Sequence, residues 1–154
     1  SLSTHENIAL VYEESGKIKE AFNHYQIAFR LKNRFPLAMK LADYYISEKN
    51  FYWAKKVLLA AVDLKPEEVG AHNNLGIAYA MLGDPVNTRK QFDMALSLDT
   101  NYRVPNIYIG IAYFKNRDLR PAEFFFKKEL KSNPTNYKAK EYLEAIHKIR
   151  KKQT

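Results

Sequence analysis

The chain has 154 residues, of which 46% are hydrophobic and 27% charged, enough to bury the core of one ordinary domain. The absence of cysteine excludes disulfide frameworks and thiolate metal sites, and no apolar run approaches the roughly 20 residues that a membrane span requires. The net charge of +8 lies mostly in the second half, since residues 78–154 hold 15 Lys and Arg against 8 Asp and Glu.

Apolar residues recur at helical spacing along the whole chain, in segments separated by turn-forming residues. This pattern predicts an all-α protein made of helical hairpins. The predicted helices are 2–15 with 18–31, 36–48 with 51–64, 69–82 with 85–98, 103–116 with 119–132, and a solitary helix at 137–150.

The turn inside each predicted pair carries residues suited to ending one helix and starting the next. In Gly83-Asp84-Pro85, glycine suits a left-handed C-terminal position, the aspartate can cap the new helix, and proline fits its first turn. Asp118 is expected to cap the eighth helix in the same way. The other breaks fall at Ser15-Gly16 and Lys49-Asn50.

A repeat of 34 residues organises these hairpins. It is marked by tyrosines at 45, 79 and 113, by Ala42, Gly76 and Gly110, and by Leu58, Phe92 and Phe126. The first copy precedes the second by 33 residues, so one residue is missing from the loop between them. The small residues are predicted to lie where the two helices of a pair cross, opposite Ala21, Ala54 and Ala122. Stacked copies would bury a continuous core that a single hairpin cannot.

The segments LGIAYAMLGD at 75–84 and IGIAYFKNRD at 109–118 resemble the signature of the tetratricopeptide repeat. The chain departs from the family where Ala38, His72 and Asn106 replace an early aromatic residue, and where Glu129 replaces a late alanine. The resemblance implies one domain over 1–154, a right-handed α-solenoid of antiparallel helix pairs with about nine helices. Its predicted parts are repeats 2–34, 35–68, 69–102 and 103–136, a capping helix at 137–150 and a basic tail at 151–154.

The resemblance also implies a concave groove, lined by the first helix of each pair, that binds a peptide or helix of a partner protein. Its candidate residues point away from the second helix of their own pair. They are Leu10, Met39, Lys40, Asp43, Asn73, Asn74, Ile77, Met81, Ile107, Tyr108, Ile111, Phe114 and Lys115. The C-terminal members are mostly apolar, and Asn74 is expected to hydrogen-bond the ligand backbone. The competing interpretation is that some of these residues are core.

Three aromatic residues occupy positions where the repeat pattern expects polar ones, namely Tyr52, Trp53 and Phe124. They define a candidate second surface, for flanking segments or for self-association, unless Trp53 folds over a neighbouring loop. The basic end, Lys148 to Lys152, is interpreted either as a solubilising end or as a contact for an anionic surface.

Other function classes receive less support from the residues. Chaperone-binding relatives hold a peptide carboxylate with Lys, Asn and Arg side chains, and only Asn74 fits that set here, so no carboxylate clamp is expected. No phosphate loop, metal motif or convergent acid–base pair is visible, which predicts a non-catalytic protein without cofactor or metal. Self-association, or contact with nucleic acid or membrane through the basic C-terminal half, stays the alternative.

The N-terminus lacks both an initiator Met and the basic and apolar segments of a secretory signal. The chain is therefore interpreted as a soluble part of a larger protein. Its Lys-, Asn- and Tyr-rich composition points to an AT-rich bacterial genome. The sequence identifies neither the compartment nor the partner.

Overall fold

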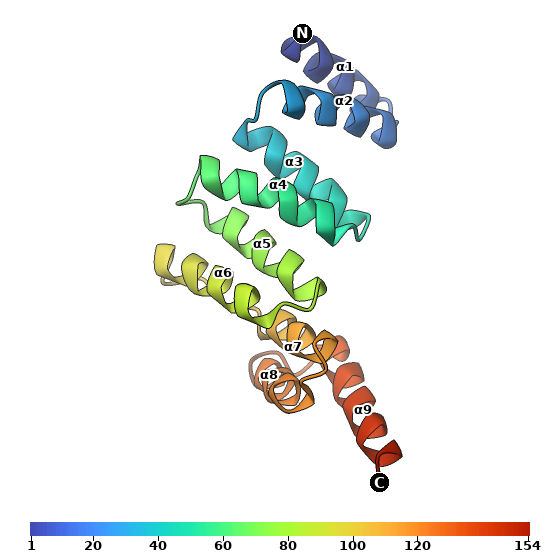
Figure 1. Cartoon of the computed structure of the whole chain (residues 1–154), viewed down its shortest axis with the longest axis vertical. Coiled ribbons are helices and arrows are strands. Elements are labelled where there is room, and N and C mark those ends of the chain that lie inside the picture. The colour runs from blue at the N-terminus through green and yellow to red at the C-terminus, as the bar shows by residue number, and fades with distance from the viewer. The chain divides into compact units, whose positions relative to one another are not determined.

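The computed structural model describes all 154 residues and contains nine α-helices joined by short connections, as predicted (Figure 1). The helices are α1 (Leu2–Glu14), α2 (Ile18–Leu31), α3 (Phe35–Ser47), α4 (Phe51–Leu64), α5 (Val69–Met81), α6 (Pro85–Leu98), α7 (Asn106–Lys115), α8 (Leu119–Ser132) and α9 (Tyr137–Lys152). None of them has the combination of length and apolar character needed to cross a membrane.

Helix boundaries differ from the predicted ones mainly at two places. The seventh helix begins at Asn106 instead of 103, because Val104 precedes Pro105 and a residue before proline is disfavoured in the helical region. The last helix continues to Lys152, so half of the predicted basic tail at 151–154 is helical.

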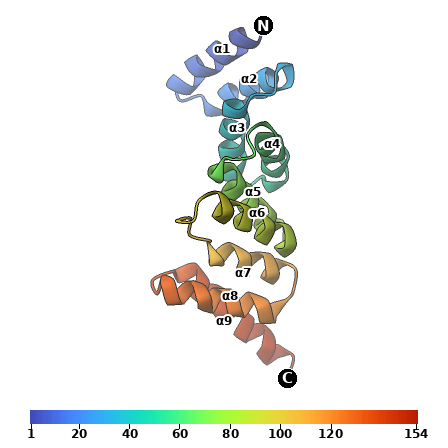
Figure 2. The ribbon, with the colours of Figure 1, turned by 90° about the vertical axis from the view of Figure 1, so that its left-hand side faces the viewer.

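The chain forms two compact units, Ser1–Leu75 and Gly76–Thr154, and α5 contributes residues to both. In the N-terminal unit, α1 pairs with α2, α3 pairs with α4, and α2 also contacts α3. In the C-terminal unit, α7 pairs with α8, α6 contacts α7, and α9 packs against α8 (Figure 2). The helices of each pair run antiparallel (Figure 1).

Each hairpin turn contains one residue in the left-handed region. These residues are Gly16, Lys49, Gly83 and Arg117, with φ between 56° and 76°, and they follow the repeat period. Lysine and arginine are strained in this conformation by roughly 1–2 kcal/mol because of their Cβ atoms. The fold therefore imposes the same turn geometry even where the sequence lacks glycine.

Two aspartates follow these turns, and only one caps its helix. Asp84 accepts a hydrogen bond from the backbone N–H of Asn87 at 3.0 Å, as predicted. The prediction for Asp118 is wrong, because its carboxylate instead accepts from the side-chain amide of Asn116 at 2.8 Å. The physical reason is Pro121, which stands at the third helical position of α8 and has no N–H to donate.

The two glycines of the repeat lie at close helix crossings. A Cβ built on Gly76 would come within 2.5 Å of the Phe92 ring, and one on Gly110 within 2.6 Å of the Phe126 ring. The residue nearest to each glycine on the partner helix is thus a fully buried phenylalanine. The absence of a Cβ at Gly76 on α5 and at Gly110 on α7 leaves room for the phenylalanine ring of the partner helix.

The solitary helix α9 covers the end of the C-terminal core. Its buried residues Ala139 and Ile146 form one cluster with Phe126 of α8 and Ile111 of α7. Tyr142 stacks on the Phe126 ring at a centroid distance of 4.8 Å. Helical spacing predicts Tyr142, Leu143, Ile146 and Ile149 for the inner face of this helix, and the first three pack in the cluster.

Candidate partner-binding surfaces

The predicted groove residue Lys40 takes part in a three-residue network in the N-terminal unit. Its Nζ donates to Glu13 Oε2 at 2.6 Å and to the Tyr25 hydroxyl at 2.9 Å, and Tyr25 in turn donates to Glu13 at 2.7 Å. The hydrogen bonds from Lys40 and Tyr25 lower the pKa of Glu13. The network joins α1, α2 and α3, so Lys40 orients these helices as well as presenting a charge.

A second polar chain connects α3 to the first half of α5. The Asn73 side-chain amide donates to Asn74 Oδ1 at 3.1 Å, and Asn74 Nδ2 donates to Asp43 Oδ1 at 3.3 Å. Burial raises the pKa of Asp43. Asn74 therefore uses its carbonyl and one of its N–H groups inside the protein, which leaves its second N–H for a ligand. Leu10 lies exposed on α1 and Met39 is half-buried on α3.

The apolar candidates of the C-terminal unit are less exposed than an open groove wall would require. Ile111 is only 4% exposed and belongs to the core, so it has almost no surface to offer a partner. The remaining members are half-buried and pack against the two buried clusters of this unit; they are Ile77, Met81, Ile107, Tyr108 and Phe114. Lys115 is exposed at the end of α7. A partner here would contact the edges of side chains that already support the core.

Glu129, a departure from the repeat pattern, has a structural role that the sequence did not reveal. Its Oε2 accepts from the backbone N–H of Ile107 at 3.2 Å, and its Oε1 accepts from the Asn136 amide at 3.0 Å. The carboxylate therefore satisfies an unpaired donor in the first turn of α7, which has no capping side chain of its own. It also ties the start of α9 to the same unit.

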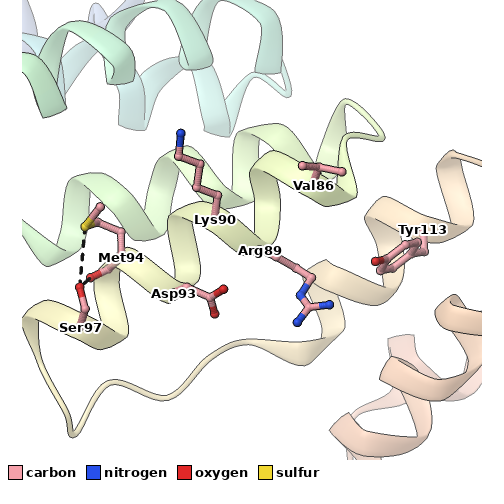
Figure 3. A pocket seen from close by; sticks show the side chains of 7 residues that line it. All are labelled: Val86, Arg89, Lys90, Asp93, Met94, Ser97 and Tyr113. Atoms are coloured by element: carbon pink, nitrogen blue, oxygen red, sulfur yellow. Dashed lines mark hydrogen bonds between the residues drawn. The ribbon is translucent and has the colours of Figure 1, made fainter.

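An open depression of about 590 Å³ runs along α6 and reaches α7 (Figure 3). Its lining carries both signs of charge, with Arg89, Lys90 and Asp93 from α6 and Tyr113 from α7. The Tyr113 ring stacks on Phe125 with centroids 5.8 Å apart. The hollow is shallow and of mixed charge, and it favours no ligand class.

The three aromatic residues of the predicted second surface lie at the surface. Tyr52 is 50%, Trp53 45% and Phe124 61% exposed. Trp53 stacks on Tyr45 at 6.4 Å, beside a hollow in the N-terminal unit, and Phe124 meets Phe125 edge-on in the C-terminal unit.

The repeat period places His72 and His147 at packing positions, which predicts that both are buried or half-buried. His72 is buried and bonds the Pro66 carbonyl oxygen at 2.8 Å, which fits its predicted packing role. The same prediction for His147 is wrong, since this side chain is exposed one position after the buried Ile146. His5 and His24 share an Nδ1–Nδ1 hydrogen bond of 3.0 Å that spacing on one helix could not reveal, because they come from α1 and α2. No group of three or more His, Cys, Asp or Glu side chains is arranged to hold a metal ion.

Comparison with known proteins finds similar tetratricopeptide repeat proteins. No family model matches the chain. Human Tetratricopeptide repeat protein 6 is 24% identical over 132 residues, which cover 80% of this chain. The chain spans only 24% of the length of that relative.

Solved structures agree with this relationship. A tetratricopeptide repeat protein from Parabacteroides merdae superposes with a TM-score of 0.73 over 98% of this chain and 59% of its own, at 16% identity. The chain therefore has the fold of tetratricopeptide repeat proteins. YrrB, described as a tetratricopeptide protein with an unusual peptide-binding site, matches with a TM-score of 0.71 at 19% identity, over 90% of this chain and 72% of its own.

A third structure, the first tetratricopeptide domain of Spaghetti (RPAP3), was solved bound to an HSP90 peptide. It matches with a TM-score of 0.58 at 19% identity, over 75% of this chain and 91% of its own. At such identities the likeness concerns the fold. The tetratricopeptide fold is one that binds peptides and proteins, and the residues that would do so must be argued from this chain itself.

Proposed function

We propose that this protein is a non-catalytic interaction module that binds a peptide or helix of a partner protein. In the C-terminal unit, the contact surface is the half-buried apolar set on α5 and α7, with Lys115 at its edge. This set is defined as the α5–α7 surface and comprises Ile77, Met81, Ile107, Tyr108 and Phe114.

One observation carries the proposal. The first helices of the third and fourth repeats keep a row of large apolar side chains only half-covered, although the core beneath them is complete. Partly exposed apolar rows on stacked hairpins are suited to the apolar face of a helix or to alternate side chains of an extended peptide. Two solved structures of the same fold support the same class of function, since one is named for a peptide-binding site and the other for a bound peptide.

A matched pair of substitutions tests the proposal. Met81 is a half-buried member of the surface, whereas its neighbour Leu82 is exposed and outside it. We expect Met81→Glu to lose the proteins that the wild type captures from a cell extract, because a carboxylate would be desolvated in the interface. Leu82→Glu should retain them. Both variants must first show wild-type helicity by circular dichroism.

Equal capture by Met81→Glu and wild type would remove the α5–α7 surface from the proposal. Light scattering over a concentration series separates partner binding from self-association at the same place. A dimer that Met81→Glu dissociates would replace a foreign partner with a second copy of the chain.

A further inference from the structure

A hollow of about 490 Å³ in the N-terminal unit lies between α2, α3 and α4 and shares no residue with the α5–α7 surface. Its volume is within the roughly 300–1,000 Å³ of typical ligand sites. Its lining is supplied by Gln26, Phe29, Arg30, Leu41, Tyr45, Asn50, Trp53, Lys56 and Val57. We call this feature the α2–α4 pocket.

Part of the pocket lining is apolar and aromatic. Leu41 and Val57 are buried and give it an aliphatic floor, and the rings of Tyr45 and Trp53 stack beside it with an interplanar angle of 25°. Trp53 nevertheless keeps 45% of its surface exposed. A half-exposed indole beside an apolar hollow is suited to cover an apolar or aromatic side chain of a ligand.

The charges of the pocket have one sign. Arg30 reaches it from α2 and Lys56 from α4, and no carboxylate lines it. Neither cation belongs to an ion pair of the structure. Lys56 lies 4.9 Å above the rings of both Tyr52 and Trp53, an exposed arrangement that a stronger anionic partner can replace.

The neutral polar groups of the pocket are already engaged. The Gln26 amide donates to the Tyr45 hydroxyl at 2.6 Å, and the side-chain oxygen Oδ1 of Asn50 accepts from the backbone N–H of Trp53 at 3.4 Å. What the pocket offers to a ligand is therefore an apolar floor, an aromatic wall and cations from two different helices.

The C-terminal unit contains an internal comparison. Its depression along α6 occupies the corresponding place in the repeat, with Tyr113 at the position of Tyr45. There Asp93 stands at the position of Gln26 and Ser97 at that of Arg30. Proline occupies the position of Trp53, at residue 121. The aromatic wall and the uniform positive charge are thus particular to the α2–α4 pocket and are not a consequence of the repeat.

We infer that the α2–α4 pocket is a second binding site, for an acidic peptide segment that carries one aromatic side chain. The aromatic side chain lies over Leu41 and Val57 against Trp53, and flanking carboxylates pair with Arg30 and Lys56. A single phosphate would use the cations and leave the apolar floor empty, whereas an acidic peptide with an aromatic residue uses both.

Trp53 is the only tryptophan of the chain, so its fluorescence reports on this pocket alone. The probe is the peptide acetyl-Asp-Glu-Asp-Phe-Glu-Asp-Glu-amide, titrated into the full chain by fluorescence and by calorimetry at low salt. We expect a saturable change of Trp53 emission with a Kd below about 1 mM, and a Kd at least about 10-fold higher when alanine replaces the phenylalanine. Raising the salt from 50 to 200 mM should weaken binding by about 3-fold or more.

Charge reversal supplies the matched control. Arg30→Glu with Lys56→Glu should raise the Kd at least about 10-fold, because the pocket then repels the flanking carboxylates. Lys148→Glu with Lys151→Glu changes the net charge equally on exposed positions of α9, and should leave the Kd within about 2-fold. All four substituted residues are exposed, so the fold should tolerate both variants.

Several results would overturn the inference. They are the absence of saturable binding, equal binding by the pocket and α9 variants, or calorimetric binding without a change of Trp53 emission. Two control ligands are a decathymidine oligonucleotide and the same peptide with Lys in place of its acidic residues. The inference is also overturned if either changes the Trp53 emission with a Kd as low as that of the acidic peptide. Loss of binding at the α5–α7 surface in Met81→Glu leaves this site intact, so the two proposals fail separately.

Discussion

The close crossing of α7 and α8 makes Gly110→Ala an informative perturbation. The new Cβ would lie 2.6 Å from both Cδ1 and Cε1 of the Phe126 ring, whereas ordinary contact begins at 3.4 Å. Ring and helix must therefore separate by about 0.8 Å in an interior packed as densely as a crystal. Phe126 is fully buried and stacked on Tyr142, so it has no free space into which to withdraw.

Two opposing effects set the expected change in the free energy of unfolding. Overpacking a core costs about 1–3 kcal/mol, and the rigidity around Phe126 favours the upper end. Alanine returns about 1 kcal/mol through its better helix propensity. The net loss is about 2 kcal/mol, which lowers the melting temperature of a domain of this size by about 4–8 °C.

Gly70→Ala is the matched control, because a Cβ at Gly70 in α5 meets nothing within 4 Å. It should be neutral or stabilising by up to about 1 kcal/mol. Calorimetry and urea unfolding monitored by circular dichroism measure both variants. A Gly110→Ala protein as stable as the wild type would refute the close-crossing argument.

A double variant tests the same geometry from the other side. The second repeat has Ala42 and Leu58 where the fourth has Gly110 and Phe126, so the chain already contains the smaller pairing. Phe126→Leu should therefore cost less stability in the Gly110→Ala background than alone, with a coupling energy of about 1 kcal/mol or more. Additive losses would show that the ring and the glycine do not interact as described.

Three further predictions concern single residues. Glu129→Ala should lower the free energy of unfolding by about 1–2 kcal/mol, because the α7 cap and the hydrogen bond to Asn136 are lost. Its control, Glu144→Ala on the exposed side of α9, should change the urea unfolding curve little. Arg117→Gly should stabilise the protein by up to about 1 kcal/mol, because it removes a Cβ from a left-handed backbone position. Arg120→Gly, within α8, should destabilise the protein by about 1 kcal/mol. Equal effects of the two variants on the melting temperature would contradict this prediction. Burial raises the pKa of Tyr102 from 10.0 to about 12, so the folded state holds this proton more tightly, and the resulting stability is full below pH 10 and lost between pH 10 and 12. Tyr102→Phe should lessen the fall of the urea midpoint over that window, and an unchanged fall would argue against the assignment.

The elements of the fold were predictable because their signals are local. Period, turn residues and helical spacing located all nine helices, and glycine at 76 and 110 indicated the close crossings. The predicted start of α7 was wrong because it followed the repeat period, whereas Pro105 disfavours a helical conformation at Val104 and delays the helix to Asn106. The failure of Asp118 to cap α8 also has a local cause, because Pro121 has no N–H to donate to its carboxylate.

The candidate surface was less predictable, because burial depends on what packs from outside a helix. Ile111 and Phe114 are both apolar, and helical spacing places both on the predicted groove face of α7. Packing against α8 and α9 nevertheless buries Ile111 and leaves Phe114 half-buried. Helical spacing predicts Lys40 as a groove residue, but Glu13 and Tyr25, which lie on other helices, bind its ammonium group.

The sequence by itself determined the all-α hairpins and their order, since backbone preferences and a 34-residue period act within one repeat. Only the tertiary structure decided which side chains remain available to a ligand. The pairing of His5 with His24 and the cap formed by Glu129 each join residues at least 19 positions apart. The hollow beside Trp53 is lined by residues of three helices. No helical period relates such residues, so their chemistry emerges when the hairpins pack.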